Sequence, residues 1–198
     1  FEANLASLKP EEGQIPARVS AEHKGMYKVL CEHGELSAEI TGRLRFDAAG
    51  RSDFPAVGDF VIITARPAEG SATIHDLLPR RTKFSRMAAG SYCDEQIVAA
   101  NLDVVFIVMS LNADFNLRRV ERYLTLAFES GAKPVVILNK ADLCEDIESR
   151  TLQAESSCPG ADVIAVSAVS GYGFDGLRKH LKPGVSVSFL GSSGVGKS

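Results

Sequence analysis

The sequence predicts two domains of different class, a small all-β barrel or sandwich followed by an α/β domain with a mostly parallel sheet. Up to about residue 85, short segments alternate apolar and polar side chains, as strands with one buried face do. After the basic stretch at residues 80–86, continuous apolar runs alternate with helical periods, which is typical of βαβ units. We therefore expect a boundary near residues 85–100, with residues 1–85 in the first domain and 86–198 in the second.

The first domain is expected to hold five short strands. They lie at residues 14–20, 25–31, 35–46 (interrupted at Gly42), 59–65 and 72–78. Turns that contain glycine or aspartate separate these segments, and none of the segments has a helical period. Several short strands with such turns favour a small barrel or sandwich.

The second domain begins with residues 103–110, a continuous apolar run that predicts a strand buried on both faces. Asn116 is a favourable helix N-cap, apolar residues then recur at helical spacing, and Gly131 can close the helix. Further strands are expected at 134–138, 162–167 and 185–190, and further helices at about 145–156 and 174–181. This alternation predicts a parallel sheet that helices cover on both faces.

Composition excludes several classes of protein. The 198 residues carry 22 Lys and Arg against 25 Asp and Glu, a net charge of −3, so no overall field attracts nucleic acid. The longest apolar run, residues 104–109, is far shorter than the ~20 residues that cross a bilayer. The four cysteines form no C-x-x-C pair, and the first residues form no secretion signal. We expect a cytoplasmic monomer with reduced thiols, no membrane contact and no zinc site within these residues.

The chain ends in a glycine-rich loop that matches G-x-x-x-x-G-K-S and directly follows an expected strand. The loop consists of Gly191, Ser192, Ser193, Gly194, Val195, Gly196, Lys197 and Ser198. Backbone N–H groups of such a loop bind phosphate oxygens, and its glycines allow an approach that a Cβ would block. Lys197 would reach the β- and γ-phosphates, and the Ser198 hydroxyl would coordinate Mg²⁺. The alternative is a Gly/Ser-rich tail, which the preceding strand disfavours.

A second motif, Asn139-Lys140-Ala141-Asp142, follows the strand expected at residues 134–138 and points to guanine. The Asp142 carboxylate can accept from guanine N1–H and from the N2 amino group, whereas adenine has neither donor at those positions. Adenine would leave the carboxylate unpaired, which costs about 2–4 kcal/mol and selects GTP over ATP. Asn139 would connect neighbouring loops and the base edge, and the Lys140 stem would cover one face of the ring.

A third segment, Val166-Ser167-Ala168, has the position at which guanine-nucleotide proteins present a backbone N–H to guanine O6. We expect Ser167 and Ala168 to complete the guanine site, with the Ala168 N–H as the donor. The order of the motifs is informative, because Asn139 precedes Gly191, whereas in ordinary small GTPases the phosphate loop comes first. A circular permutation gives this order and keeps the sheet, provided that the original termini lie close together.

With these motifs in place, the sequence resembles the circularly permuted, ribosome-associated GTPases of bacteria, specifically the ribosome small-subunit-dependent GTPase A family. The resemblance rests on the segments 55–59 (Pro-Ala-Val-Gly-Asp), 78–86, 100–103 (Ala-Asn-Leu-Asp), 122–124 (Arg-Tyr-Leu), 139–143 and 191–198. It covers nearly the whole chain beyond its first residues.

The resemblance implies a multidomain fold, an N-terminal all-β OB-fold barrel followed by an α/β P-loop GTPase domain that is circularly permuted and truncated here after the P-loop. It implies GTP or GDP with Mg²⁺, and Zn²⁺ only in a C-terminal domain beyond Ser198. It also implies the small ribosomal subunit and its rRNA as partners, in late subunit maturation. The switch I threonine and the D-x-x-G loop would follow Ser198, so the catalytic residues stay unknown. We expect these 198 residues alone to hydrolyse no GTP and to bind it poorly.

Positive charge is concentrated in the connector. Its cations are Arg80, Arg81, Lys83 and Arg86. They are candidates for contacts to rRNA phosphates, and a solvated interdomain linker explains them equally well. Aromatic side chains on an OB barrel can stack on bases, and the candidates are Tyr27, Phe46, Phe54 and Phe60, of which Phe60 is favoured as a core residue.

Two other functions stay open on the sequence. One is an RNA-binding module that uses guanine nucleotide only as a conformational sensor, and GTP turnover by the full-length protein, with and without small subunits, would separate it from a GTPase. The other is an ATP-using P-loop protein with a chance N-K-A-D. Equal protection from heat by ADP and GDP would favour that function.

Overall fold

A computed structural model of the chain describes residues 11–87, 95–112 and 115–197. Contacts between residues group the chain into two compact units, Phe1–Asn101 and Leu102–Ser198. The sequence analysis divides the chain after residue 85 instead, and the two divisions differ by residues 86–101, which include a strand of the first unit. The division after residue 85 stays a prediction.

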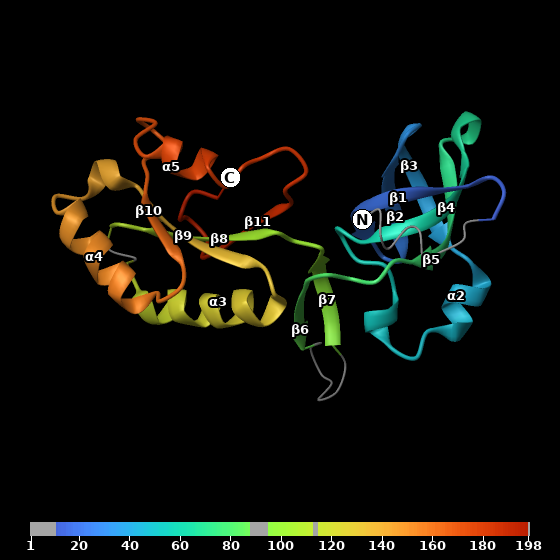
Figure 1. The fold of residues 1–198 in the computed structure, drawn as a ribbon, viewed down its shortest axis with the longest axis horizontal. Coiled ribbons are helices and arrows are strands. Elements are labelled where there is room, and N and C mark those ends of the chain that lie inside the picture. Colours follow the sequence, from blue (N-terminus) through green and yellow to red (C-terminus); the bar gives the residue numbers. More distant parts are fainter. Residues whose placement is uncertain (1–10, 88–94, 113–114, 198) are drawn as a thin grey trace. The chain divides into compact units, whose positions relative to one another are not determined.

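The described part of the first unit contains a closed five-stranded barrel with the strand order β1-β2-β3-β5-β4 (Figure 1). Its strands are β1 (Gln14–His23), β2 (Met26–Cys31), β3 (Gly34–Ile40), β4 (Phe60–Arg66) and β5 (Ser71–Leu77). β1 pairs antiparallel with both β2 and β4, and β3 pairs parallel with β5, which closes the barrel. Val29, Val61, Ile63 and Ile74 are fully buried inside it. The expected all-β barrel is confirmed, and its strand order is that of an OB fold.

The strand expected over residues 35–46 is wrong beyond Ile40, where β3 ends. Helix α2 (Gly42–Asp47) follows, and Thr41 is its N-cap because the Leu44 N–H donates to Thr41 Oγ1 at 3.2 Å. None of the residues of α2 is buried, so no apolar helical period marks it in the sequence. Two short 3₁₀ helices, η1 (Arg51–Asp53) and η2 (Pro67–Glu69), lie on either side of β4 in the chain.

The first unit ends with an antiparallel strand pair that the sequence analysis did not predict. It consists of β6 (Lys83–Met87) and β7 (Glu95–Ala100). The end of β7 packs closely on the loop before β4, since a Cβ added to Gly58 would collide with the Ala100 carbonyl oxygen. Gly58 also has a φ of +92°, a conformation that glycine adopts readily.

The described part of the second unit is built on a four-stranded sheet with the order β10-β9-β8-β11. The strands are β8 (Val104–Ser110), β9 (Lys133–Asn139), β10 (Asp162–Ala165) and β11 (Val187–Gly191). Every pair in this sheet is parallel. All residues of β8 are buried, as its continuous apolar run predicts. The expected parallel α/β sheet is confirmed.

The helices of the second unit are α3 (Leu117–Ser130), α4 (Ile147–Ser157) and α5 (Phe174–Arg178), with the 3₁₀ helix η3 (Ala141–Leu143) after β9. The predicted caps of α3 are confirmed, because the Arg119 N–H donates to Asn116 Oδ1 at 3.1 Å and Gly131 closes the helix with a φ of +83°. α3 and α5 lie on opposite faces of the sheet (Figure 1). None of the helices in the described segments has the length and apolar character that crossing a bilayer requires.

Candidate nucleotide-binding site

The predicted nucleotide loops all follow the carboxyl ends of parallel strands. Asn139 is the last residue of β9, Gly191 is the last residue of β11, and Ser167 comes shortly after β10. Carboxyl ends of parallel strands meet at one edge of a sheet, where ligands of open α/β folds bind. Loops that are far apart in the sequence are therefore brought to one place by the register of the sheet.

The side chain of Asn139 joins these loops. It is 4% exposed, its Nδ2 donates to the Val195 carbonyl oxygen at 2.9 Å, and its Oδ1 accepts from the Ala168 N–H at 3.2 Å. Gly196 lies directly against the amide, because a Cβ at that position would collide with Asn139 Nδ2. One buried carboxamide thus holds the glycine-rich loop and the loop after β10 in contact.

The next residue adds a second connection between the same loops. Lys140 has a φ of +63°, which turns the chain sharply after β9. Its Nζ donates to the Gly194 carbonyl oxygen at 2.7 Å, so the lysine side chain extends across to the glycine-rich loop. The prediction that this stem covers one face of a guanine ring stays a prediction.

The carboxylate of Asp142 is held by Ser167. The Ser167 hydroxyl donates to Asp142 Oδ1 at 2.5 Å and accepts from the Ser170 N–H at 3.1 Å. Ser167 is fully buried, whereas Asp142 is exposed. The buried hydroxyl therefore fixes the direction of an accessible carboxylate, which is what recognition of two neighbouring donors on a base requires.

The glycine-rich loop curls around its own lysine. Lys197 Nζ donates to the carbonyl oxygens of Gly191 at 2.8 Å and of Ser192 at 2.5 Å. Gly194 and Gly196 have φ values of +80° and +90°, which residues with a Cβ rarely adopt. Val195 is 1% exposed and packs in the core, so it anchors the loop to the sheet. Ser198, the expected magnesium ligand, lies outside the described residues.

The Ala168 N–H was expected to serve guanine O6, but in the structure it donates to Asn139 Oδ1. The bond is long for an N–H···O contact, at 3.2 Å. Contact of this N–H with a base stays a prediction. Ala168 itself is exposed and directly follows the buried Ser167.

Sequence reasoning missed Arg119. This residue lies in the first turn of α3, and its Nη1 donates to the hydroxyl of Ser192 at 2.7 Å. Arg119 therefore connects helix α3 to the start of the glycine-rich loop. The sequence held a partial signal for this contact, because the predicted N-cap at Asn116 places Arg119 in the first turn of the helix. β8, which precedes that turn, pairs with β11, which leads into the glycine-rich loop.

Arg80, one of the candidate RNA contacts, has a structural role instead. Its guanidinium donates to the Asp59 carboxylate at 2.7–3.1 Å and to the carbonyl oxygens of Ser52 at 2.5 Å and Phe54 at 2.8 Å. The side chain is 15% exposed, and the Asp59 side chain is fully buried. A guanidinium with these partners is occupied within the protein, so we leave Arg80 out of the proposed RNA contacts.

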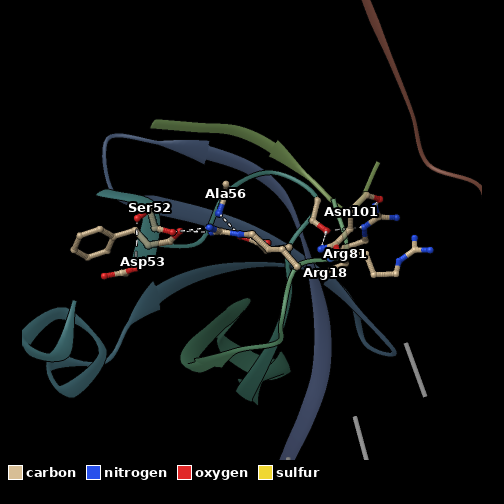
Figure 2. A network of polar contacts seen from close by, with 10 residues as sticks. Arg18, Ser52, Asp53, Ala56, Arg81 and Asn101 are labelled. Atoms are coloured by element: carbon tan, nitrogen blue, oxygen red, sulfur yellow. Dashed lines mark hydrogen bonds and ion pairs between the residues drawn. The ribbon is translucent and has the colours of Figure 1, made fainter. Parts of the chain in front are cut away.

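The other connector cations differ from Arg80. Arg81 and Lys83 are exposed, and the side chain of Arg86 lies outside what the structure describes. The backbone N–H of Arg81 donates to Asn101 Oδ1 at 2.9 Å, and Asn101 Nδ2 donates to the Gly58 carbonyl oxygen at 3.2 Å (Figure 2). Asn101 thus fixes the backbone of the connector and leaves the Arg81 side chain at the surface.

A β-barrel followed by a parallel α/β sheet that ends in a G-x-x-x-x-G-K-S loop defines the class of P-loop nucleotide-binding proteins with an N-terminal barrel. The sequence model of the RsgA GTPase family matches residues 77–198, which is more than half of the chain. The chain therefore belongs to the RsgA GTPase family. The family resemblance found in the motifs is confirmed.

Curated relatives agree with this assignment. The small ribosomal subunit biogenesis GTPase RsgA 2 of Lactiplantibacillus plantarum is 45% identical over 193 residues, covering 98% of this chain and 54% of the relative. The RsgA protein of Opitutus terrae is 46% identical over 195 residues, covering 94% of this chain and 53% of the relative. The chain thus spans about half the length of the curated relatives it matches.

Solved structures share the fold. The crystal structure of YjeQ from Thermotoga maritima matches with a TM-score of 0.74 at 26% identity, covering 93% of this chain and 63% of that one. The crystal structure of YloQ, a circularly permuted GTPase, matches with a TM-score of 0.68 at 21% identity, covering 96% of this chain and 63% of that one. The barrel and the permuted order of the α/β elements are therefore common to these proteins.

Proposed function

We propose that the whole protein is a GTPase that acts in biogenesis of the small ribosomal subunit, and that this chain supplies its guanine- and phosphate-binding loops. The relatives named above are small ribosomal subunit biogenesis GTPases. The observation that carries the proposal is the Asn139 carboxamide, which bonds to Val195 in the glycine-rich loop and to Ala168 after β10. A single side chain connects the loop expected to bind phosphates with the loop expected to bind the base.

Base selection would depend on Asp142. Its carboxylate would accept from the two adjacent donors of guanine, while Ser167 keeps it oriented through the 2.5 Å hydrogen bond. Lys140 would pack its aliphatic stem on the base, since its Nζ is already directed to Gly194 in the glycine-rich loop. Adenine offers Asp142 no donors, which supports GTP over ATP as the substrate.

Phosphate binding would depend on the glycine-rich loop. Gly194 and Gly196 keep the backbone of the loop in the left-handed region, and Lys197 would exchange its carbonyl partners for phosphate oxygens. The residues fit a nucleotide with Mg²⁺, because a glycine-rich loop after a strand is followed by a lysine and a serine. The Ser198 hydroxyl would hold the ion, which supplies positive charge to the phosphates.

The remaining expectations concern the partners and the rest of the whole protein. Arg81 and Lys83 on the connector would contact rRNA, together with Arg86. The whole protein would be a cytoplasmic monomer, with a zinc-binding domain and the switch segments outside this chain. Ordering of those switches by GTP would favour the subunit-bound state, and hydrolysis would permit release. The 198 residues alone would not turn over GTP.

The substitution Asp142→Asn tests the proposal in the full-length protein. An amide in place of the carboxylate cannot accept from N1–H and N2 of guanine in the same way, but its N–H₂ can donate to the 2-carbonyl of xanthine. We expect GTP turnover stimulated by small subunits to fall by about 100-fold at subsaturating substrate, in line with a loss of about 2–4 kcal/mol. Turnover of xanthosine triphosphate should rise correspondingly.

The matched control is Asp175→Asn, which removes a carboxylate from an exposed ion pair with Arg178 on α5. It should leave turnover of both nucleotides unchanged. Loss of GTP turnover in Asp142→Asn without any gain for the xanthine nucleotide would contradict base recognition by Asp142. GTP binding by the wild type with no turnover, even with small subunits, would favour the nucleotide-sensor alternative.

A further inference from the structure

A groove of about 570 Å³ lies between helix α4 and the loop that follows β10. β10 is the edge strand of the sheet in the described part of the unit, and α4 packs against it (Figure 1). We call this surface the α4 groove; the lining residues used below are Glu148, Leu152, Glu155 and Tyr172. None of the described residues assigned to the base or the phosphates lines it, so the proposed GTPase activity leaves the groove unused.

The groove carries apolar side chains that the fold leaves in contact with solvent. Leu152 on α4 is 62% exposed, and Tyr172 on the opposite wall is 53% exposed. The helix buries Ala154 against the rest of the unit, so Leu152 is not needed for its packing. Apolar side chains that gather in an exposed groove, rather than lying singly, are typical of sites that bind another protein.

The charge of the groove is wholly negative. Among the described residues that line it, the charged ones are Glu148 and Glu155, which are both exposed. Neither side chain forms a hydrogen bond or an ion pair within the described segments. The one cation in the sequence of α4, Arg150, lies over the ring of Phe115 at 4.6 Å and does not line the groove. A neighbouring groove of about 680 Å³ shares Glu148 and Leu152 and likewise has no cation among its described lining residues.

The spacing of these side chains fits an extended, cationic peptide. Glu148, Leu152 and Glu155 lie on one face of α4, because residues three and four apart are neighbours on a helix. The two glutamates are about 10 Å apart along the helix axis, at about 1.5 Å per residue. An extended chain advances about 3.3 Å per residue, so two cations three residues apart match this spacing. An apolar side chain between the two cations would then meet Leu152 and Tyr172.

We propose that the α4 groove binds a basic, extended segment of a protein of the small ribosomal subunit. Two Lys or Arg side chains of that segment pair with Glu148 and Glu155, and an apolar side chain between them packs on Leu152. The proposal rests on the proposed function, which makes the small subunit the partner of the whole protein. A protein assembled with rRNA carries cationic segments, because it has to neutralise phosphates. The acidic groove complements such a segment, whereas it repels the phosphates of the rRNA itself.

The first test measures binding of the full-length protein, loaded with a non-hydrolysable GTP analogue, to purified small subunits. The double variant Glu148→Gln/Glu155→Gln should weaken binding by about fivefold, as for the loss of two exposed ion pairs. This loss should shrink as the salt rises, because exposed charges interact over about 10 Å at 0.1 M salt and over less at higher ionic strength. The matched control Glu121→Gln/Glu129→Gln removes two exposed carboxylates from α3 and should leave the affinity unchanged.

Leu152→Ala tests the apolar contact separately from charge. Affinity for small subunits should fall by about three- to tenfold, and this loss should persist at high salt, because burial of apolar surface is not screened. The midpoint of thermal unfolding should not change, since Leu152 is mostly exposed in the chain alone. Leu126→Ala, at an exposed leucine of α3, is the control and should leave the affinity unchanged.

The sign of the change in the glutamate double variant identifies the class of partner. Tighter binding would mean that the groove faces rRNA, and unchanged binding would mean that the groove is empty in the complex; either result overturns the proposal. A photoreactive amino acid at position 152 then identifies the contact in the complex with small subunits. The crosslinked peptide should come from a subunit protein and contain two Lys or Arg residues three positions apart. Crosslinks to rRNA alone, or none to the subunit, would also overturn the proposal.

The same measurements separate this proposal from the proposed function. A wild-type protein that fails to bind small subunits with any guanine nucleotide would contradict the proposed function. A wild type that binds them, with an affinity that neither Leu152→Ala nor the glutamate double variant changes, would contradict only the role of the α4 groove.

Discussion

The imidazole of His180 lies beside the parallel sheet, with its ring edge-on to Phe106 and the ring centroids 6.3 Å apart. Burial is the main cause that lowers the pKa of His180. Nearby lysines, of which Lys133 has the largest effect, lower this pKa further, whereas Asp162 raises it. The side chain is 12% exposed, and its Nε2 lies 3.6 Å from Asp162 Oδ2. The folded chain therefore favours the neutral ring more strongly than the unfolded chain does.

This shift predicts a loss of stability in mild acid. An unfolded histidine titrates near 6.5, and in the folded chain His180 titrates below that value, so the unfolded state binds more protons in this range. The free energy of unfolding should therefore fall as the pH drops from 7.5 to 5.5. His180→Gln should remove this contribution and make the dependence shallower. Urea denaturation at a series of pH values measures it.

Asp162→Asn supplies a control of opposite sign. Because Asp162 raises the pKa of His180, its removal should make the loss of stability over the same pH range steeper. The pKa of Asp162 itself is lowered by its hydrogen bond to Lys133, so its own titration lies below this range. A shallower slope in Asp162→Asn, or an unchanged slope in His180→Gln, would contradict the assignment.

Single residues also differ in how well the sequence predicts their roles. Asn139 and Asp142 belong to a motif whose chemistry is visible in the sequence, and the structure places Asn139 against the glycine-rich loop. Arg80 belongs to a run of cations, and its pairing with the buried Asp59 depends on a contact across the barrel unit that no local pattern records. Sequence motifs predict chemistry well, whereas the partner of a long side chain depends on the tertiary fold.

At the scale of elements, helix α3 is coupled to the glycine-rich loop through Arg119 and Ser192. Arg119→Gln should therefore loosen the start of the loop and weaken GDP binding by about fivefold, as for the partial loss of a charged hydrogen bond. Calorimetric titration of the full-length protein measures this change.

Arg118→Gln is the matched control, because Arg118 is exposed on the same helical turn. It should leave the affinity for GDP unchanged. The midpoint of thermal unfolding without nucleotide should be the same in both variants. Equal affinities in Arg118→Gln and Arg119→Gln would show that the contact with Ser192 has no role in nucleotide binding.

Elements are predictable where their signals are local. β8 is a continuous apolar run, and α3 has both an N-cap and a closing glycine, so the sequence predicts both of them. In α2 the residues Arg43, Leu44, Arg45 and Phe46 alternate in polarity as a strand does, and the helix buries none of them. The β6–β7 pair is not predicted, because its two strands are separated in the sequence and because the cations of the connector are equally typical of a solvated linker. Whether a segment such as α2 forms a helix or a strand depends on which of its side chains are buried, and burial depends on the tertiary fold rather than on the local sequence.

At the scale of the whole molecule, the two units have separate hydrophobic cores. The core of the barrel gathers around Val29, Val61 and Ile74, and the core of the second unit gathers around Phe106 and Val135. In the sequence, the change from period-two alternation to continuous apolar runs predicts an all-β first unit and an α/β second unit. The position of the boundary is less predictable, since β7 belongs to the first unit by its contacts although the family match begins at residue 77.

Separate cores predict where bound GDP protects the molecule. All predicted nucleotide loops lie in the second unit, so GDP at about 100 times its Kd should stabilise that unit by about 2.7 kcal/mol. Hydrogen exchange of the full-length protein should slow in peptides that cover residues 139–143, 166–168 and 191–197, whereas barrel peptides at 14–77 should exchange as before. Asp142→Asn should abolish this protection. Equal slowing in the barrel would mean that the two cores unfold as one cooperative body, and no slowing in the loops at saturating GDP would place the nucleotide elsewhere.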